Sequence, residues 1–178
     1  MTDTLKVGII LGSTRTGRVS PSVGEWVLKQ SEKNADATYE LIDIKDYQLP
    51  LLGEGSSDGI KRFKDKLNTL DGFIFVVSEY NHSFSAALKN ALDHAREEWY
   101  HKAAGIVSYG SAGGVRAAEH LRGVLGELNV ADVRTHVFFS LFDDFKDQRF
   151  APRDVHQANM QQLFKDVNRW AQALKTIR

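Results

Sequence analysis

The stretch from Gly12 to Ser20 carries the groups with which proteins bind phosphate. It combines hydroxyl side chains, two arginines and small residues, and it precedes a predicted helix. A phosphate dianion needs oriented N–H and O–H donors, positive charge and the favourable end of a helix dipole. The candidate phosphate ligands are Gly12, Ser13, Arg15, Arg18 and Ser20. The alternative interpretation is an ordinary polar turn between a strand and a helix.

Two common phosphate-binding sequences are absent from this stretch. The nucleoside triphosphate loop ends in Gly-Lys-Ser/Thr, but no lysine occurs between Lys6 and Lys29. The dinucleotide fingerprint Gly-x-Gly-x-x-Gly needs a glycine at position 14, where this chain has Thr14. Neither of these two nucleotide-binding loops is therefore predicted.

Two further segments combine polar, aromatic and glycine residues. Ser78–Ser85 contains Glu79, Tyr80 and Asn81, which offer an aromatic face and backbone amides to a ring system. Ser108–Arg116 has three glycines within five residues, which allow a ligand to approach the backbone closely. Each segment also has a purely structural interpretation: a helix start capped by a serine in the first, and a strand–helix turn in the second.

The elements between these segments alternate between strand and helix patterns. Short apolar runs predict buried strands, and amphipathic stretches predict helices. The predicted strands are Lys6–Leu11, Tyr39–Ile44, Phe73–Val77, Ala104–Ser108 and Val133–Leu141, and helices are predicted after Ser20 and over 60–70, 83–101, 115–128 and 155–177. This alternation predicts an α/β fold in one domain over residues 1–178, the flavodoxin-like three-layer sandwich: a five-stranded parallel sheet of order 2-1-3-4-5 with helices on both faces. Because ligands bind outside the carboxyl ends of parallel strands, the three polar segments are expected at one edge.

Several side chains have positions that predict a structural role. Ser20 is predicted to cap the helix that follows it. Trp26 and Trp170 lie on apolar helix faces and are predicted in the core, whereas Trp99, near a helix end, is predicted at a subunit interface. Residues 143–152 are predicted to form a loop.

Composition excludes several classes of function. The 178 residues include 23 Lys and Arg and 23 Asp and Glu, and this balance argues against nucleic-acid binding. The chain has no cysteine, which removes thiolate nucleophiles, Cys-dependent phosphatases and iron–sulfur clusters. Glu98 and His101 have the Glu-x-x-His spacing of carboxylate-bridged metal sites, but a second such pair is missing, so no metal is predicted. With no apolar run near the ~20 residues of a membrane span and no signal-peptide pattern, we expect a cytoplasmic protein without membrane insertion.

Taken together, the three polar segments resemble the NAD(P)H-dependent FMN reductase family. The sequences that carry the resemblance are Leu11–Arg15 with Ser20, Ser78–Ser83 with Leu88–Asp93, and Gly110–Gly114. The most specific part is Glu-Tyr-Asn followed by Leu-Lys-Asn-Ala-Leu-Asp. The family usually has proline before Glu-Tyr-Asn, whereas this chain has Ser78, so the backbone angle that proline would fix is free here.

The resemblance implies a flavodoxin-like fold and noncovalently bound FMN. It further implies hydride transfer from NADPH or NADH to a small-molecule acceptor such as a quinone, free flavin, metal ion or azo compound, in a homodimer or homotetramer. By motif position, Ser13, Arg15 and Ser20 would bind the FMN phosphate, Glu79, Tyr80 and Asn81 would border the isoalloxazine ring, and Ser108, Tyr109, Gly110 and Gly113 would line its other edge. Because FMN carries the chemistry, no catalytic side chain is predicted.

Two other functions are compatible with the same segments. One is an electron carrier of the flavodoxin kind, and the other is an FMN-binding protein without turnover. Electron carriers are generally strongly acidic so that they dock on basic partners, and the balanced charge of this chain argues against that function.

Overall fold

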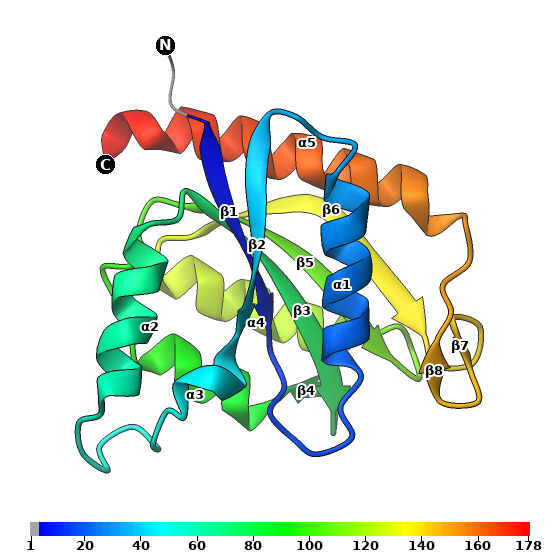
Figure 1. Ribbon diagram of the computed structural model, residues 1–178, viewed down its shortest axis with the longest axis horizontal. Helices are drawn as coiled ribbons and strands as arrows, with labels where there is room; N and C mark the ends of the chain where they lie inside the picture. Colours follow the sequence, from blue (N-terminus) through cyan, green and yellow to red (C-terminus); the bar gives the residue numbers. More distant parts are fainter. Residues whose placement is uncertain (1–3) are drawn as a thin grey trace.

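A parallel sheet built from the predicted apolar segments lies at the centre of the molecule (Figure 1). The computed structural model describes residues 4–178. The sheet consists of β1 (Leu5–Leu11), β2 (Ala37–Asp43), β3 (Gly72–Tyr80), β5 (Ala103–Gly110) and β6 (Ala131–Ser140), in the order β2-β1-β3-β5-β6. This order confirms the predicted 2-1-3-4-5 arrangement, because β5 and β6 are the fourth and fifth parallel strands along the chain.

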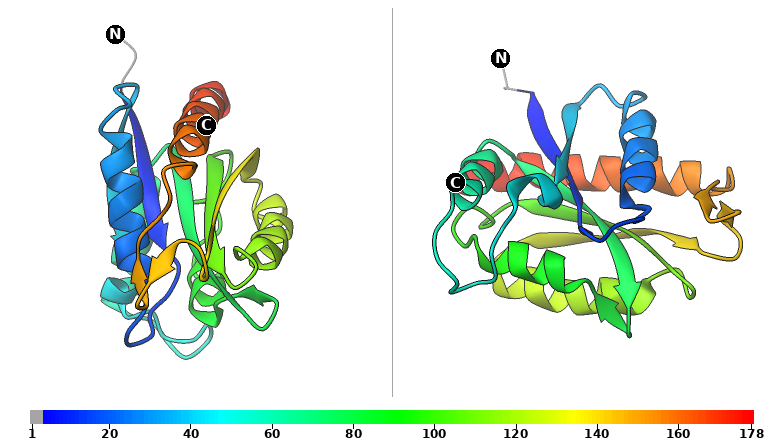
Figure 2. Two further views of the ribbon diagram at one scale, coloured as in Figure 1. Left: turned by 90° about the vertical axis from the view of Figure 1, so that its right-hand side faces the viewer. Right: turned by 60° about the horizontal axis from the view of Figure 1, so that its bottom comes forward.

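Helices cover both faces of the sheet. They are α1 (Ser20–Ser31), α2 (Asp58–Asn68), α3 (Ala86–Asp93), α4 (Val115–Glu127) and α5 (His156–Leu174), with short 3-10 turns η1 (Ile44–Tyr47) and η2 (Lys175–Ile177). Side chains of α1 and α5, such as Val23 and Leu163, share one core, while Phe63 of α2, Leu92 of α3 and Leu121 of α4 share the other. The left view of Figure 2 shows the strands between α1 and α4. The molecule is therefore a three-layer α/β sandwich.

Strand β3 shows how the sequence places the candidate site. Residues 72–78 are all buried because helices cover both faces of the sheet, and such strands consist of uninterrupted apolar residues. At Glu79 and Tyr80 the strand leaves the core and becomes accessible. The carboxyl ends of β1, β3 and β5 meet at the lower edge in Figure 1, as expected for the three polar segments.

The segment after β3 differs from the helix predicted over 83–101. Asn81 and His82 have positive φ angles of 45° and 73°, and β4 (Ser83–Phe84) then pairs antiparallel with the end of β3. Two consecutive left-handed residues form the tight hairpin turns that connect antiparallel strands, and asparagine tolerates this conformation. The helix begins only at Ala86, after this hairpin.

The boundaries of α3 have separate causes. Ser85 caps the helix, as predicted for one of two serines, because its Oγ accepts a hydrogen bond from the Leu88 amide at 3.1 Å. After Asp93 the chain turns inward, and Trp99 is only 1% exposed. The Trp99 ring packs 4.9 Å, centroid to centroid, from that of Phe73, so its predicted place at a subunit interface is wrong. A large aromatic ring near a helix end fills the core here.

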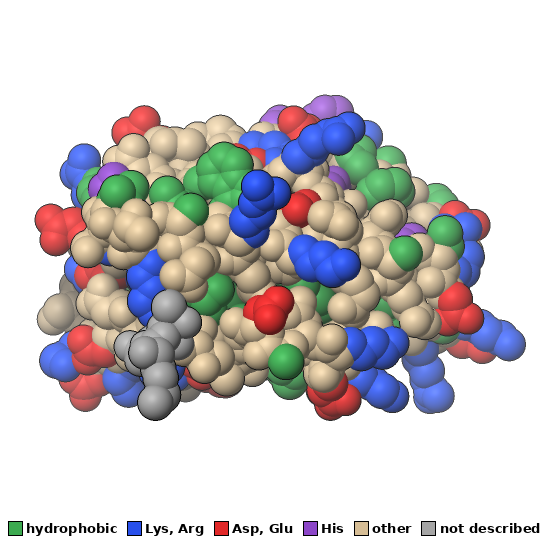
Figure 3. Space-filling view, turned by 90° about the horizontal axis from the view of Figure 1, so that it is seen from above, with side chains coloured by type: hydrophobic (Ala, Val, Ile, Leu, Met, Phe, Trp, Pro, Cys, Tyr) green, Lys and Arg blue, Asp and Glu red, His purple; other side chains and the backbone are tan. Residues whose placement is uncertain are grey.

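Of the other two tryptophans, Trp26 packs against the core and Trp170 does not. Trp26 is half-buried, with its ring 5.3 Å from that of Phe139, whereas Trp170 is 49% exposed on α5 and does not belong to the core. The face drawn in Figure 3 carries interspersed acidic and basic side chains, in keeping with the equal totals. Within residues 4–178, none of the helices combines the length and the apolar character that a membrane crossing requires.

Candidate functional site

A cleft of about 470 Å³ lies at the carboxyl edge of the sheet, where the three polar segments meet. Its lining comes from the loop after β1, the ends of β3 and β5, and the segment after β6: Arg15, Gly17, Val19, Ser78, Glu79, Tyr80, Tyr109, Gly110, Leu141, Phe145, Asp147 and Gln148. This volume is within the range of small-molecule and cofactor sites, and the carboxyl edge is where α/β sheets bind ligands.

Arg15 provides positive charge at the cleft. Its Nε donates a hydrogen bond to the Tyr80 hydroxyl at 2.7 Å, and its Nη1 donates to the Thr16 carbonyl at 3.0 Å. Burial alone would raise the pKa of Tyr80, but polar contacts, led by the hydrogen bond from Arg15, together outweigh it and lower this pKa. The exposed guanidinium thus links the loop after β1 to Tyr80 and retains N–H groups for an anion.

Arg18 was predicted to bind phosphate, but its guanidinium is paired with groups of the protein. Its Nη1 lies 2.6 Å from Asp43 Oδ1, and the same group donates to the Ser13 carbonyl. The Arg18 side chain is only 11% exposed. The structure therefore places this guanidinium as a brace that ties the loop after β1 to the end of β2.

Two buried hydroxyls at this edge have no hydrogen-bond partner within the described chain. They are Ser20 Oγ and Ser78 Oγ. Ser20 does not cap α1 as predicted, because the helix includes Ser20 as its first residue and Val19 takes the cap position without a side-chain bond. Buried polar groups are nearly always paired in folded proteins. Two unpaired hydroxyls at the ligand-binding edge of the sheet therefore fit a polar ligand.

Glu79 fastens the end of β3 to the start of α4. Its carboxylate is 5% exposed and accepts hydrogen bonds from Arg116 Nε at 2.7 Å and from the Arg116 amide at 3.2 Å. Burial would raise the pKa of Glu79, but these bonds and one from the Ala117 amide hold it below its usual range. The carboxylate is thus hydrogen-bonded to the start of α4. Glu79 therefore stabilises the wall of the cleft and does not present an unpaired charge to a ligand.

We expect Glu79→Gln to lower the free energy of unfolding by about 1–3 kcal/mol, because it weakens charge-assisted hydrogen bonds in a buried position. Urea unfolding of the variant and of Glu119→Gln measures this effect. Glu119 is a suitable control because its side chain is 70% exposed and pairs only within α4. Equal stability of the two variants would contradict the assigned role of Glu79.

The hydroxyl of Ser108 is hydrogen-bonded to a neighbouring loop and a neighbouring strand. Its Oγ is 2.6 Å from the Gly113 carbonyl and 2.8 Å from His136 Nε2. A carbonyl can only accept, so Ser108 donates to Gly113 and must accept from a protonated Nε2 of His136. Burial lowers the pKa of His136 to about 4, which keeps the ring neutral. His136 was not predicted, because nothing in the sequence of β6 marks its partner on β5.

The glycine loop after β5 depends on close packing. Gly113 has a φ of +71°, and a Cβ there would lie 2.7 Å from the Phe138 ring. Tyr109 and Gly110 precede this loop and line the cleft. Burial raises the pKa of Tyr109 to about 12, so its phenol stays protonated and able to donate.

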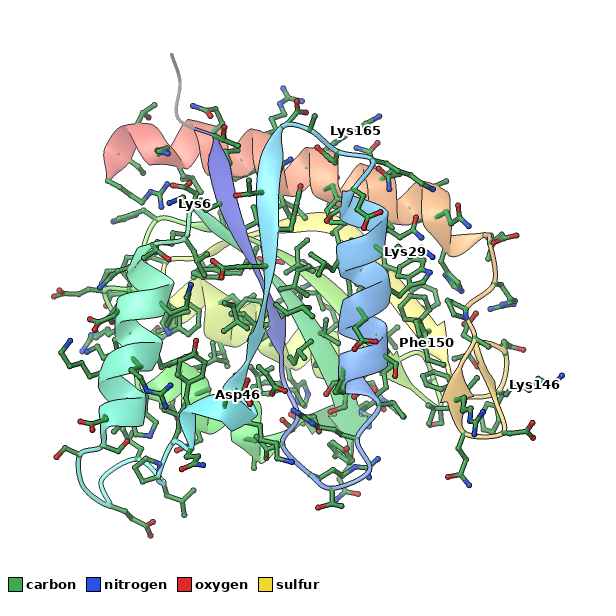
Figure 4. The ribbon with its side chains drawn as sticks, in the orientation of Figure 1. Lys6, Lys29, Asp46, Lys146, Phe150 and Lys165 are labelled. Carbon is green, nitrogen blue, oxygen red and sulfur yellow. The ribbon has the colours of Figure 1, made fainter. Side chains whose placement is uncertain are left out.

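The segment predicted as a loop over 143–152 forms one wall of the cleft. It contains a hairpin of β7 (Phe145–Lys146) and β8 (Arg149–Phe150), whose turn has positive φ at Asp147 and Gln148. Figure 4 shows Phe150 directed toward α1 and Lys146 directed away from the molecule. This wall was not predicted, because charged residues around two phenylalanines are typical of an irregular loop.

The hairpin is anchored by the carboxylate of Asp144, which is fully buried. It accepts hydrogen bonds from the Ser140 amide at 3.0 Å, Arg153 Nε at 3.0 Å and His156 Nε2 at 2.8 Å. Burial alone would raise the pKa of Asp144, but the hydrogen bonds, led by those of Arg153, lower it to about 2.

The structure brings only some predicted residues together. Those that line the cleft are Arg15, Glu79, Tyr80, Tyr109 and Gly110. Those outside its lining are Gly12, Ser13, Arg18, Ser20, Asn81, Ser108 and Gly113. Most of the second group is buried and shapes the loops, whereas Asn81 is exposed at the β3–β4 turn.

The Glu98–His101 segment is not gathered into a metal site. Glu98 Oε1 lies 2.9 Å from Lys64 Nζ, and Glu98 Oε2 accepts from the Arg96 amide. Over residues 4–178, no cluster of three or more potential His, Asp or Glu ligands occurs.

Comparison with known proteins identifies the family. Residues 5–144 match the family described as NADPH-dependent FMN reductase. An NAD(P)H-dependent FMN reductase of Schizosaccharomyces pombe is 36% identical over 137 residues, covering 71% of this chain and 68% of that protein. A second one, of Saccharomyces cerevisiae, is 33% identical over 145 residues, covering 71% and 76%. A 2-hydroxy-1,4-benzoquinone reductase of a Burkholderia species is 29% identical over 137 residues, covering 71% and 73%.

Solved structures agree on the fold. The flavoenzyme NAD(P)H:(acceptor) oxidoreductase FerB of Paracoccus denitrificans has a TM-score of 0.76 at 17% identity, covering 95% of this chain and 98% of that one. The NADH:FMN oxidoreductase EMOB, in its apo form, has a TM-score of 0.71 at 22% identity, covering 96% and 90%. The fold is thus flavodoxin-like, and the chain belongs to the NADPH-dependent FMN reductase family of oxidoreductases.

Proposed function

We propose that this protein binds FMN noncovalently and uses it to transfer hydride from NADPH or NADH to a small-molecule acceptor. The proposal is carried by the cleft at the carboxyl edge, which combines Arg15 with the unpaired buried hydroxyl of Ser78 in a chain of this family. The likeness to a 2-hydroxy-1,4-benzoquinone reductase supports quinones as acceptors. Free flavins, metal ions and azo compounds are the other acceptor classes to be assayed.

The residues present fit FMN. Arg15, with Ser13 and Ser20, would hold the phosphate at the start of α1, where the helix dipole favours an anion. Arg18 would keep this loop in shape through Asp43. The remaining binding residues would be Gly12 in the first loop, Glu79, Tyr80 and Asn81 on one edge of the ring, and Ser108, Tyr109, Gly110 and Gly113 on the other.

When bound, FMN supplies the hydride chemistry, so the protein has to bind, orient and shield it. Backbone amides around Tyr80 and Asn81 would donate to the polar edge of the ring. The protonated Tyr109 phenol is available as a further donor. Leu141 and Phe145 would exclude water from one side of the cleft.

The wider organisation follows from the resemblance. We propose that residues 1–178 form one FMN-binding domain that works in the cytoplasm as a homodimer or homotetramer. Light scattering after size-exclusion chromatography measures the oligomeric state directly.

An absorbance spectrum followed by anaerobic reduction tests the proposed function. We expect the purified protein, or the protein mixed with FMN, to show visible flavin absorbance that bleaches when NADPH or NADH is added without another reductase. A quinone added next is expected to restore the colour. Failure to take up FMN would refute cofactor binding. Binding without bleaching would instead indicate an electron carrier, and bleaching without turnover of quinones, ferric chelates or azo dyes a noncatalytic protein.

A further inference from the structure

Ser78 occupies the last buried position of β3, at the cleft. The residue is only 3% exposed, and its Oγ has no hydrogen-bond partner within the described chain. The phenols of Tyr80 and Tyr109 lie beside it, but neither phenol forms a hydrogen bond of ordinary geometry with Ser78 Oγ. The Tyr80 hydroxyl already accepts from Arg15 at 2.7 Å. A buried hydroxyl without a partner, on a residue that lines a cleft, is suited to a partner that enters the cleft.

The neighbouring strand offers a direct contrast. Ser108 of β5 is also buried, but its hydroxyl donates to the Gly113 carbonyl and accepts from His136. These two serines at the same edge of the sheet thus differ in whether the hydroxyl is already hydrogen-bonded within the protein. The hydroxyl of Ser108 stabilises the fold, whereas that of Ser78 has no bond to lose.

The position of β3 indicates which part of the cofactor Ser78 meets. In the sheet, β3 lies between β1, whose loop carries Arg15, and β5, which leads into the glycine loop. In a bound cofactor whose phosphate lies at the first loop and whose ring lies between the ends of β3 and β5, the polyol chain joins the phosphate to the ring. This chain must therefore pass the end of β3. Polyol hydroxyls both donate and accept, as the hydroxyl of Ser78 does.

We propose that Ser78 Oγ is a hydrogen-bonding ligand of the polyol chain of the bound flavin. This inference rests on the proposed function. It assigns a binding role to a residue that was not among the predicted cofactor ligands. The unpaired hydroxyl lowers the stability of the empty protein and increases its affinity for the cofactor.

Ser78→Ala tests this inference through two readouts that move in different directions. Thermal unfolding of the flavin-free variant is expected at the wild-type temperature or above it, since no hydrogen bond is lost. The dissociation constants for FMN and riboflavin are expected to rise by the same factor, about 3- to 10-fold. The dissociation constant for lumiflavin, which has the ring without the polyol chain, is expected to stay unchanged.

Two further variants complete the experiment. Ser108→Ala, the matched control, is expected to lower the unfolding temperature of the flavin-free protein, because it leaves the Gly113 carbonyl unpaired. Ser78→Thr keeps a hydroxyl on a strand position that suits a β-branched residue, so it is expected to restore FMN affinity.

Each contrary result has a distinct meaning. Lower stability of flavin-free Ser78→Ala, matching Ser108→Ala, would show that the Ser78 hydroxyl is structural and overturn the inference. Unchanged affinities would also overturn it, and weaker binding of FMN alone would assign Ser78 to the phosphate instead. If the wild-type protein bound none of the three flavins, the proposed function itself would fail.

Discussion

Replacing Asp144 with alanine is expected to lower the free energy of unfolding by about 2–4 kcal/mol at neutral pH. The buried carboxylate accepts from the Ser140 amide, from Arg153 and from His156. Without it, buried donors lose their acceptor, and each such loss costs about 1–3 kcal/mol. Arg153 is 54% exposed and regains water, so the loss falls mainly on the backbone amides and His156. Urea unfolding followed by circular dichroism measures the difference.

The same substitution is expected to have a characteristic pH dependence. The pKa of Asp144 falls from the ordinary 3.8 to about 2 in the folded protein, so the unfolded chain binds its proton first. Stability from this group is therefore complete above about pH 4 and is lost as the pH falls through about 2. The shift corresponds to about 2 kcal/mol. The gap in stability between wild type and Asp144→Ala is expected to narrow by about this amount across that window.

Asp143→Ala is the matched control for Asp144→Ala. Its carboxylate is 56% exposed and approaches Arg153 only to 3.9 Å, so its removal is expected to change stability by less than about 0.5 kcal/mol. Amide hydrogen exchange across residues 140–153 locates the effect. Because Phe145 and Gln148 line the cleft, a loosened hairpin should also weaken FMN binding. Equal effects of the two alanine variants would contradict the anchoring role of Asp144.

The sheet and its ligand edge could be predicted because each follows from local sequence. Apolar runs such as Phe73–Val77 are long enough for strands and uninterrupted, which identifies strands buried on both faces. Their alternation with helices then determines the parallel order, which in turn places the three polar segments at one edge.

Hydrogen bonds between residues that are distant in the sequence could not be predicted from local patterns. Arg18 and Ser108 have the side chains of ligand-binding residues, but Asp43 and His136, far along the chain, occupy them. The β3–β4 turn was missed because the helix was predicted to begin at Ser83, whereas Asn81 and His82 adopt left-handed conformations that return the chain along β3 as a strand. Sequence patterns identify the kinds of residue at the site, and only the fold determines which of them are already paired.

Replacing Arg15 with methionine is expected to weaken FMN binding by about 10- to 150-fold, since a charge-assisted hydrogen bond contributes about 1.5–3 kcal/mol. Methionine keeps much of the length of the side chain and removes its charge. Arg15 is exposed at the cleft, and its hydrogen bond to Tyr80 at 2.7 Å is also exposed to solvent, so the fold itself should lose little. Fluorescence titration of the flavin-free protein gives the affinity.

Riboflavin separates charge recognition from loss of shape in this variant. It lacks the phosphate, so Arg15→Met is expected to change its affinity by less than about threefold. Arg169→Met, on α5, removes a positive charge from an exposed position and is expected to change neither affinity. If Arg15→Met weakened FMN and riboflavin binding equally, Arg15 would be acting on the ring or the polyol chain. The phosphate would then have to be held by the backbone amides and hydroxyls of the loop after β1, with the α1 dipole as the main source of positive potential.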